Sequence, residues 1–552
     1  MKTVIIGGGA GGATTATRVR RLDEQAEIIM FERGEHVSYA HCGLPYYIGG
    51  VIEDRNSLLI SNPQQLKRRY RIEARIGSQV QAIIPDDKKI EVVDLRTGKQ
   101  YQEGYDKLVL SPGAEAVRPS LPEIDLEGVF TLRNLTDADT ILNFITERQP
   151  REAVVVGGGF IGLEMAENLK LRGIGVTVVE MLDQVMPNLD PEVAAMVQKT
   201  LRSNGIRLVL ADAVASFTRR RGRILVTLKS GLELRCDMVM LSIGVKPNIE
   251  LAKSAGLEIG KHGGIKVNEY MQTSNPEIFA VGDSVETVHV VTGEPGLIPL
   301  AGPANRQARL AADNIYGRKV AYRGTLGTSI VRLFDRTAAA TGANEKTLRR
   351  LGFSYEKCYL HPFSHATYYP HASQMAMKVL FSPSNGRILG AQIVGDDGVD
   401  KRIDVLATAI MAGMAVEDLT HLELGYVPQY GSAKDAINLA GYVASNIIRG
   451  DAPVAHWHGI SKMLSEKDVL LDVRTKEEFL QDTVPQAMNL PVDELRSRLG
   501  ELARDATIYP YCRVGQRSYI ATRILKQRGF DVKNMSGGFL TYKASKPDEV
   551  ES

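Results

Sequence analysis

Two cysteines stand in settings where sulfur chemistry is expected. Cys42 lies in the stretch SYAHCGLPYY, residues 38–47, and no other cysteine is near it in the chain. It must ionise to a thiolate before it can attack a sulfur atom. A neighbouring imidazole or the amides of a helix terminus would lower the thiol pKa and so favour that form. The four cysteines in 552 residues form no C-x-x-C pair and have no metal-ligand spacing, which predicts a reducing compartment and no metal site.

Cys512 begins the six-residue loop CRVGQR, of the form C-x-x-G-x-R, between a strand-like and a helix-like stretch. The backbone N–H groups of such a loop, the guanidinium of Arg517 and the dipole of the following helix stabilise an anion. That environment suits a cysteine thiolate and a persulfide carried on it. Related phosphatase loops are longer, so the length favours sulfur transfer. The alternative is a buried structural cysteine, which is the role we expect for Cys236 and Cys358.

Two glycine clusters predict two dinucleotide sites. Each follows a β-branched run and precedes a helical stretch, KTVIIGGGAGG at the start of the chain and EAVVVGGGFIG from residue 152. Each has the form G-x-G-x-x-G, and the strand after it ends in an acid, Glu32 or Glu180. The first glycine makes the turn, the second admits the pyrophosphate and the third lets helix and strand pack, while the acid binds the ribose. No arginine adjoins Glu180 to hold a 2′-phosphate, which favours NADH over NADPH.

Strands and turns of the surrounding sequence must position these residues. Residues 105–114, 240–248 and 273–286 are each typical of a strand that ends in a glycine turn, and a helix is expected from about Pro303. Residues from about 325 to 446 mix strand and helix patterns without a dinucleotide motif. A linker and a small α/β segment follow them.

Composition limits the partners. The formal charge of +2 gives no basic excess, so a nucleic-acid partner is not expected. The sequence has no apolar run of the roughly 18 residues that a membrane span needs, so no membrane association is expected. The first strand starts at Thr3, which leaves no room for a cleavable signal peptide, and we expect a cytoplasmic protein.

Together these motifs resemble the FAD- and NAD(P)H-dependent pyridine nucleotide-disulfide oxidoreductases. Within them the sequence is similar to the coenzyme A disulfide or persulfide reductases that carry a C-terminal rhodanese domain. The resemblance rests on both glycine motifs and on FAVGD, SYAHCGLPY, YYP, GYVPQYGSAKD and CRVGQRS, in the expected order. It implies an α/β protein with two Rossmann-like dinucleotide-binding domains, an α+β dimerisation domain and a rhodanese-like α/β domain. The implied boundaries are 1–149 and 251–324 for FAD binding, 150–250 for NADH binding, 325–446 for dimerisation, 447–455 for a linker and 456–552 for the rhodanese domain.

The resemblance also implies roles for single residues, carried over from the matching motifs. FAD would be held by Gly7, Gly9, Gly12, Glu32, Arg33 and Asp283. NADH, with NADPH as the alternative, would be held by Gly157, Gly159, Gly162, Glu180 and Gly244. Coenzyme A would contact Thr14, Arg18, Arg21, Ser38, His41, Asn305, Arg306 and Lys434. The catalytic residues would be Cys42, Cys512, Tyr368, Tyr426 and Arg517, with the tyrosines reaching the partner's active site in a homodimer.

Some of these residues have a second interpretation. His41 stands where the family usually has Asn, and it either lowers the pKa of the adjacent thiol or packs as an ordinary residue. The run RVRRL on the first helix suits the phosphate end of coenzyme A, because arginine matches phosphate geometry; otherwise it is a solvated helix face. The two tyrosines either donate a proton to the leaving thiolate or pack.

The family members with a C-x-x-x-x-C pair form an internal disulfide, which this chain cannot do at Cys42. The resemblance therefore implies a mixed disulfide of Cys42 with coenzyme A. The predicted reaction is reduction of coenzyme A persulfide, coenzyme A disulfide or polysulfide by NAD(P)H through FAD, with release of coenzyme A and hydrogen sulfide. The rhodanese domain would handle sulfane sulfur. The alternatives are an NADH oxidase or peroxidase that uses a cysteine sulfenic acid, and an enzyme that is primarily a sulfurtransferase at Cys512.

Overall fold

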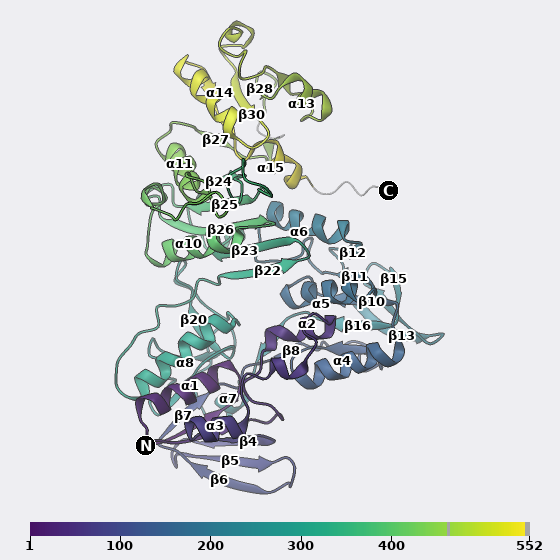
Figure 1. The fold of residues 1–552 in the computed structure, drawn as a ribbon, viewed down its shortest axis with the longest axis vertical. Coiled ribbons are helices and arrows are strands. Elements are labelled where there is room, and N and C mark those ends of the chain that lie inside the picture. Colours follow the sequence, from purple (N-terminus) through teal and green to yellow (C-terminus); the bar gives the residue numbers. More distant parts are fainter. Residues whose placement is uncertain (461–463, 547–552) are drawn as a thin grey trace. The chain divides into compact units, whose positions relative to one another are not determined.

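The computed structural model describes residues 1–460 and 464–546, and these form two compact units (Figure 1). The first unit comprises Met1–Asp183 and Gly205–Gly327. The second comprises Gln184–Asn204 and the described residues from Thr328 onward. Residues 184–204 therefore belong to the second unit, although the predicted NADH-binding domain contains them in sequence.

A five-stranded parallel sheet carries the first glycine loop. Its strand order is β19-β7-β1-β2-β3, with bounds Ile278–Ala280, Lys107–Leu110, Lys2–Ile6, Glu27–Phe31 and Glu73–Arg75. Helices α1 (Ala10–Leu22) and α8 (Ala301–Ile315) lie side by side against it (Figure 1). A buried cluster joins this sheet to both helices and to the antiparallel strands β4 (Ser78–Ile84), β5 (Lys89–Asp94) and β6 (Gln100–Gly104). Because the central strands are covered, they are almost wholly apolar in sequence.

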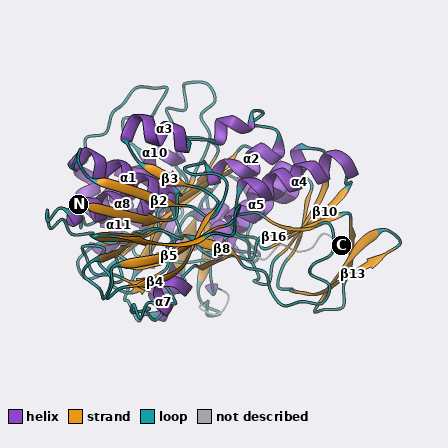
Figure 2. Ribbon diagram, turned by 90° about the horizontal axis from the view of Figure 1, so that it is seen from below, coloured by secondary structure: helices purple, strands orange, loops and turns teal. Residues whose placement is uncertain are grey.

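A second five-stranded parallel sheet carries the second glycine loop. Its order is β12-β11-β10-β16-β9, with bounds Ile206–Val209, Gly175–Val179, Glu152–Val156, Met238–Leu241 and Val129–Thr131. Helix α5 (Phe160–Leu171) packs on it beside β10 and β16, as Figure 2 shows. Helices α2 (Leu44–Gly49) and α4 (Leu135–Arg148) pack together, and α2 also packs against α5. The antiparallel strands β13 (Val214–Arg220), β14 (Arg223–Leu228) and β15 (Glu233–Cys236) complete this region.

The second unit begins with an antiparallel sheet. Its order is β22-β23-β26-β25-β24, with bounds Ser329–Leu333, Arg336–Gly342, Ile388–Gly395, Ala376–Phe381 and Glu356–Leu360. Helices α10 (Val399–Met411) and α6 (Pro191–Ser203) pack against this sheet, and α11 (Ala436–Ile448) contacts β24. The sheet and α10 confirm the predicted mixture of strand and helix.

The C-terminal part of the second unit is a small parallel α/β domain. Its main sheet has the order β29-β28-β30-β31, with bounds Met488–Asn489, Val469–Asp472, Thr507–Tyr511 and Asp531–Val532. The helices here are α13 (Lys476–Gln481), α14 (Gln516–Gln527) and α15 (Gly538–Ser545). The expected linker, 447–455, ends in strand β27 (Val454–Ala455), which pairs in parallel with β32 (Asn534–Met535). Trp457, just after it, is buried among aromatic side chains of the domain.

Candidate active site

The first glycine loop joins β1 to α1 and leaves an open space at its middle glycine. Gly7 has a φ of +99°, and a Cβ built on it would lie 2.0 Å from the carbonyl oxygen of Ser111. A Cβ on Gly12 would lie 1.9 Å from the carbonyl oxygen of Gly7. At Gly9 the nearest atom would be Cε1 of His41 at 3.8 Å. Helix α1 begins here without a side-chain cap, which leaves N–H groups for an anionic ligand. The loop fits a dinucleotide pyrophosphate.

The second glycine loop has the same construction between β10 and α5. Cβ atoms on Gly157 and Gly162 would lie 2.4 Å and 2.0 Å from backbone carbonyl oxygens, whereas a Cβ on Gly159 would meet nothing within 4 Å. Helix α5 also begins without a side-chain cap. Gly244, in the turn after β16, is exposed and equally unobstructed. Both loops therefore have the geometry that the spacing predicts, with room for a ligand only beside the middle glycine.

The acids after β2 and β11 are held in matching positions. Glu32 accepts hydrogen bonds from the backbone N–H groups of Gly8 and Gly34, both at 2.8 Å. Glu180 accepts from the N–H of Gly158 in the second loop at 2.6 Å and from that of Leu182, two residues after it, at 2.9 Å. Each carboxylate is thus fixed at the carboxyl end of its strand, next to the glycine loop. At this position each carboxylate can accept hydrogen bonds from the ribose hydroxyls of a bound dinucleotide.

Asp283 follows β19, and two residues that were not predicted from the sequence, Arg133 and Gln307, form hydrogen bonds with the turn that contains it. Arg133 donates to the Asp283 carboxylate at 3.1 Å. The N–H of Gly282 donates to the Gln307 side chain of α8 at 2.8 Å, which fixes this turn against the helix. Arg133 and Asp283 are 150 residues apart in sequence, so no local pattern could have paired them. The predicted Arg33 is exposed.

Cys42 lies in the single turn His41–Gly43 just before α2, and it is the exposed cysteine of the four. The surrounding protein and the carboxylates of Glu164 and Asp283 raise the pKa of its thiol. Glu164 is on α5 and accepts a hydrogen bond from the Tyr46 hydroxyl at 3.1 Å. Burial and these two negative charges therefore favour the neutral thiol over the thiolate.

Of the two interpretations of His41, the structure supports packing. Its ring stacks on Tyr39 with centroids 4.1 Å apart. Burial and the positive charge of Arg133 lower the pKa of His41 to about 4. The imidazole is therefore neutral near pH 7, so a pKa effect of His41 on the Cys42 thiol would have to act through a hydrogen bond rather than a positive charge, and that role stays a prediction.

Five of the residues predicted to contact coenzyme A lie on the adjoining helices α1 and α8, namely Thr14, Arg18, Arg21, Asn305 and Arg306. The Thr14 hydroxyl donates to Asn305 at 2.6 Å. Arg18 is paired with Asp313, with donor distances of 2.9 and 2.7 Å, while Arg306 is exposed. The structure therefore brings together two groups of predicted residues, one on each helix, although Thr14 and Asn305 are 291 positions apart in sequence.

The three arginines of the basic run RVRRL differ in how far they are buried. Arg20 is buried and donates to the backbone carbonyl oxygens of Tyr70 and Arg71 and of two residues near the end of α1. It is therefore structural, and only Arg21 keeps an exposed guanidinium in that run. Ser38 has a φ of +50°, and its N–H donates to the carbonyl oxygen of Gly8 at 2.8 Å, which places it beside the first glycine loop.

The two predicted catalytic tyrosines meet on the second unit. The hydroxyls of Tyr368 and Tyr426 are 2.7 Å apart, and the residues are 75% and 49% exposed. Tyr430, a few residues further along the chain, is also exposed. Lys434 is exposed in the segment that leads into α11. Because these tyrosine side chains are exposed, they are not part of the packed core of their own unit.

Cys512 follows β30 and is only 1% exposed. The N–H of Gly515 donates to its sulfur at 3.2 Å, and α14 begins at the next residue. The sulfur therefore faces a backbone donor at a helix N-terminus, as the loop sequence predicts. Cys236 and Cys358 are buried in strands, and burial raises the pKa of each thiol to about 12.

Arg517 is fixed by an acid that sequence reasoning missed. Its guanidinium donates to both oxygens of Glu478, at 2.6 and 2.7 Å. This pairing lowers the pKa of Glu478 to about 2. Glu478 also accepts from the N–H of Thr475 as part of a capping box at the start of α13. Arg517 is thereby held in one orientation beside the Cys512 loop.

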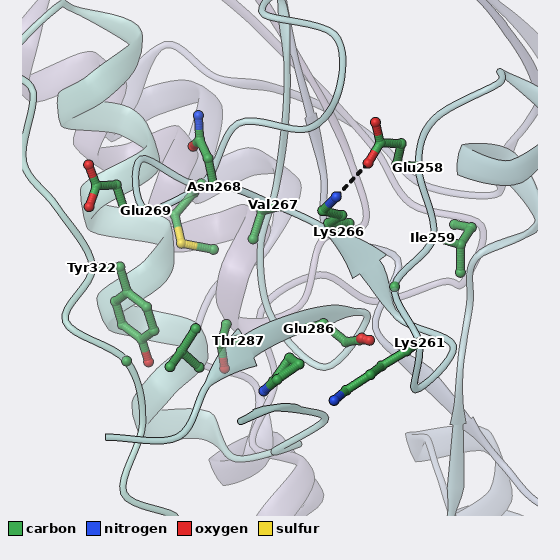
Figure 3. A pocket seen from close by; sticks show the side chains of 15 residues that line it. Glu258, Ile259, Lys261, Lys266, Val267, Asn268, Glu269, Glu286, Thr287 and Tyr322 are labelled. Atoms are coloured by element: carbon green, nitrogen blue, oxygen red, sulfur yellow. Dashed lines mark hydrogen bonds and ion pairs between the residues drawn. The ribbon is translucent and has the colours of Figure 1, made fainter. Parts of the chain in front are cut away.

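Two other features are separate from the predicted residues. Asp190, Glu192 and Glu345 converge closely enough to hold a metal ion, but the ammonium of the buried Lys378 pairs with all three. A cavity of about 530 Å³ lies in the first unit, lined by residues that include Glu258, Lys266 and Tyr322. Figure 3 shows that Lys266 is paired with Glu258 across its wall. None of the predicted site residues lines this cavity.

Comparison with known families divides the chain as the motifs do. The pyridine nucleotide-disulphide oxidoreductase family matches residues 1–308, and the dimerisation domain of that family matches residues 328–436. The rhodanese-like domain matches residues 458–545. Among the described residues, no helix combines the length and the apolar character needed to cross a membrane.

Two of the proteins similar to this chain are named for the reduction of coenzyme A disulfide and of persulfide. The coenzyme A disulfide reductase of Staphylococcus haemolyticus is 36% identical, over 81% of this chain and 100% of its own. The structure of reduced Bacillus anthracis CoADR-RHD has 48% identity and a TM-score of 0.97, and the match covers 98% of each chain. That of an NAD-dependent persulfide reductase from A. fulgidus has 39% identity and a TM-score of 0.92, covering 98% of this chain and all of the other.

Proposed function

The chain belongs to the pyridine nucleotide-disulphide oxidoreductase family and ends in a rhodanese-like domain. On that premise we propose that it uses NADH to reduce coenzyme A persulfide, with coenzyme A disulfide and polysulfide as related substrates. FAD and NADH are the cofactors, and Cys42 is the residue that attacks sulfur. Cys512 accepts and delivers sulfane sulfur.

The observation that carries this proposal is the solitary, exposed Cys42 beside the first glycine loop. Cys236, Cys358 and Cys512 are all buried, and all four cysteines are free thiols. An internal disulfide at Cys42 is therefore excluded in this conformation. The second sulfur must belong to a substrate, and an exposed position suits one as large as coenzyme A.

The proposed chemistry balances in two steps. The Cys42 thiolate attacks the inner sulfur of the persulfide, forming a Cys42–S–S–CoA disulfide as the S–S bond of the substrate breaks and HS⁻ leaves. NADH and one proton then supply two electrons, which cleave the mixed disulfide to the Cys42 thiol and coenzyme A. The flavin, when bound, relays this electron pair from nicotinamide to sulfur. Coenzyme A disulfide follows the same path, with a coenzyme A thiolate as the first leaving group.

The remaining site residues bind and orient the cofactors and the coenzyme A substrate. Glu32 and Glu180, fixed by backbone N–H groups, accept from the ribose hydroxyls of FAD and NADH. The α1 and α8 pair, with Arg21 and Arg306 exposed, supplies cations for the phosphates of coenzyme A. The match to a dimerisation domain and the exposed tyrosines support a homodimer in which these tyrosines protonate or hydrogen-bond the leaving thiolate.

The test is anaerobic NADH oxidation with coenzyme A persulfide, coenzyme A disulfide and peroxide offered in parallel, with sulfide measured. We expect rapid oxidation with the persulfide, release of one sulfide per NADH, and complete loss in Cys42→Ser. The Cys512→Ser variant should keep reduction of free coenzyme A persulfide and lose transfer of sulfur from thiosulfate to cyanide.

Two outcomes would replace the proposal. Activity with peroxide alone would make Cys42 a sulfenic-acid cysteine, as in the oxidase alternative. Transfer from thiosulfate to cyanide without any NADH-dependent sulfur reduction would make the protein primarily a sulfurtransferase. Full NADH-dependent activity in Cys42→Ser would remove that residue from the mechanism.

A further inference from the structure

The loop that carries Cys512 rests on the first turn of α15. The N–H of Phe539 donates to the carbonyl oxygen of Cys512 at 2.8 Å, and the N–H of Leu540 donates to that of Arg513 at 3.1 Å. The contact is close, because a Cβ built on Gly538 would lie only 2.3 Å from the Cys512 carbonyl oxygen. A shift of this turn would therefore tilt the Cys512 and Arg513 peptides, and with them the donors that face the sulfur.

The turn is itself fastened by a residue outside the rhodanese-like domain. The hydroxyl of Thr541 donates to the carbonyl oxygen of Gly537 at 3.2 Å and is 2.9 Å from Nε2 of His361. A hydroxyl has one proton; with that proton on the Gly537 carbonyl oxygen, Thr541 accepts from His361, and this assignment puts the His361 proton on Nε2. His361 directly follows β24 of the dimerisation domain. It is buried, and burial lowers its pKa to about 4, so it remains a neutral donor near pH 7.

A second contact from the same strand reinforces this fastening. The N–H of Tyr359, in β24, donates to the hydroxyl of Ser536 at 3.1 Å. A Cβ on Gly537 would lie 2.6 Å from Cβ of Tyr359, so the backbone of the turn lies directly against the strand. The end of β24 thus holds the residues just before α15, while α15 holds the Cys512 loop.

We propose that His361 is a positioning residue for sulfur transfer at Cys512. The dimerisation domain, through the hydrogen bond from His361 to Thr541, sets the orientation of the first turn of α15 and hence of the Cys512 peptide. The inference rests on the proposed role of Cys512 as a sulfur carrier. It adds a contribution to that site from a domain that the rhodanese sequence does not include.

The test uses the full-length holoenzyme and measures kcat and KM for transfer of sulfur from thiosulfate to cyanide. Thr541→Val removes the hydroxyl at almost constant volume, and His361→Leu removes the donor. We expect kcat to fall by about 10- to 100-fold in both, since misplacement of a reacting group by about 1 Å has effects of that size. Thr541→Ser and His361→Gln retain the hydroxyl and an N–H donor, and each should recover most of the lost kcat. NADH-dependent reduction of free coenzyme A persulfide should remain within about twofold of the wild type, because it occurs at Cys42.

Ser545→Ala is the matched control, because it also removes a hydroxyl from α15, one whose hydrogen bond among the described residues is to the carbonyl oxygen of Thr541 in the same helix. It should leave kcat unchanged. The proposal is overturned if Thr541→Val and His361→Leu lower only the melting temperature and leave kcat per folded molecule unchanged, or if the conservative variants fail to rescue kcat. If the wild type transfers no sulfur while still reducing coenzyme A persulfide, the carrier role of Cys512 is refuted, and this inference is refuted with it. That result is seen in the wild type alone, whereas failure of the positioning role of His361 is seen only in the variants, so the two failures are distinguishable.

Discussion

Glu180 offers the sharpest test of how the second glycine loop selects its nucleotide. Its carboxylate accepts from the N–H groups of Gly158 at 2.6 Å and Leu182 at 2.9 Å, which leaves its charge fixed beside the loop. Met181, the next residue, is 67% exposed and apolar, so no cation stands there for a 2′-phosphate. Glu180→Gln keeps the size and one acceptor oxygen but removes the charge. We expect it to weaken NADH use and to improve NADPH use.

Two effects determine the magnitude of the change: the substitution weakens NADH use and it improves NADPH use, so both lower the preference for NADH. Hydrogen bonds to a charged group contribute about 1.5–3 kcal/mol, and those to a neutral group about 0.5–1.5 kcal/mol, so NADH should lose about 1 kcal/mol. Repulsion between the carboxylate and a 2′-phosphate costs at least about 1 kcal/mol at 4 Å in a water-like medium, and the substitution relieves it. Together these effects amount to about 2 kcal/mol or more. The ratio of kcat/KM for NADH to that for NADPH should therefore fall by about 30-fold or more.

The assay is anaerobic oxidation of each nucleotide with coenzyme A disulfide as acceptor. Glu32→Gln is the matched control, because Glu32 accepts the same pair of backbone hydrogen bonds at the first loop. That variant should lose FAD more readily on dilution and leave the nucleotide ratio unchanged. A change in the ratio of less than about threefold in Glu180→Gln, or an equal change in Glu32→Gln, would refute the assignment of Glu180 to the NADH ribose.

Three further predictions follow from the same structure. Besides burial, the negative charge of Glu164 raises the pKa of the Cys42 thiol. Glu164→Gln should therefore shift the pH profile of Cys42 alkylation in the reduced enzyme toward lower pH. An unshifted profile would contradict this. Gly159→Ala should weaken NADH binding, measured by fluorescence titration, and leave the melting temperature unchanged. Gly162→Ala should instead destabilise the protein, because its Cβ would lie 2.0 Å from a carbonyl oxygen. Lys378→Met should cost about 3–5 kcal/mol of unfolding free energy at pH 7, since it leaves the carboxylates of Asp190 and Glu192 without a cation, whereas Glu345 keeps its pairing with Lys357. Urea unfolding should show that loss shrinking toward pH 5 as the carboxylates take up protons, and an equal loss at both pH values would argue against the ion cluster.

The parts of the fold that the sequence predicted are those built from neighbours in the chain. Each glycine loop and its acid lie within about 25 residues, so one βαβ unit brings them together, and both copies have the expected geometry. The helix expected from about Pro303 begins at Ala301, as a local pattern allows. The CRVGQR loop likewise presents a backbone N–H to Cys512, because a strand, a tight loop and a helix follow one another there.

The parts that could not be predicted depend on which distant segments pack together. RVRRL is uniformly basic in sequence, yet Arg20 is buried and binds backbone carbonyl oxygens, Arg18 is paired with an acid of α8, and Arg21 is exposed. Periodicity alone cannot assign these three fates, because each depends on what covers that face of α1. The same holds for His41, whose neutral state follows from its burial and from Arg133 on another segment.

The exposure of Cys42 and Cys512 agrees with the division of work proposed for them. Cys42 is exposed and therefore accessible to a bulky partner, and the chain raises the pKa of its thiol. Cys512 is 1% exposed and has a backbone donor on its sulfur. A site so enclosed can carry one additional sulfur atom but not a coenzyme A molecule in the same conformation. Under the proposed function, we therefore expect sulfur to leave Cys512 only in a more open conformation, in which the thiol of coenzyme A can reach it and carry the sulfur to Cys42.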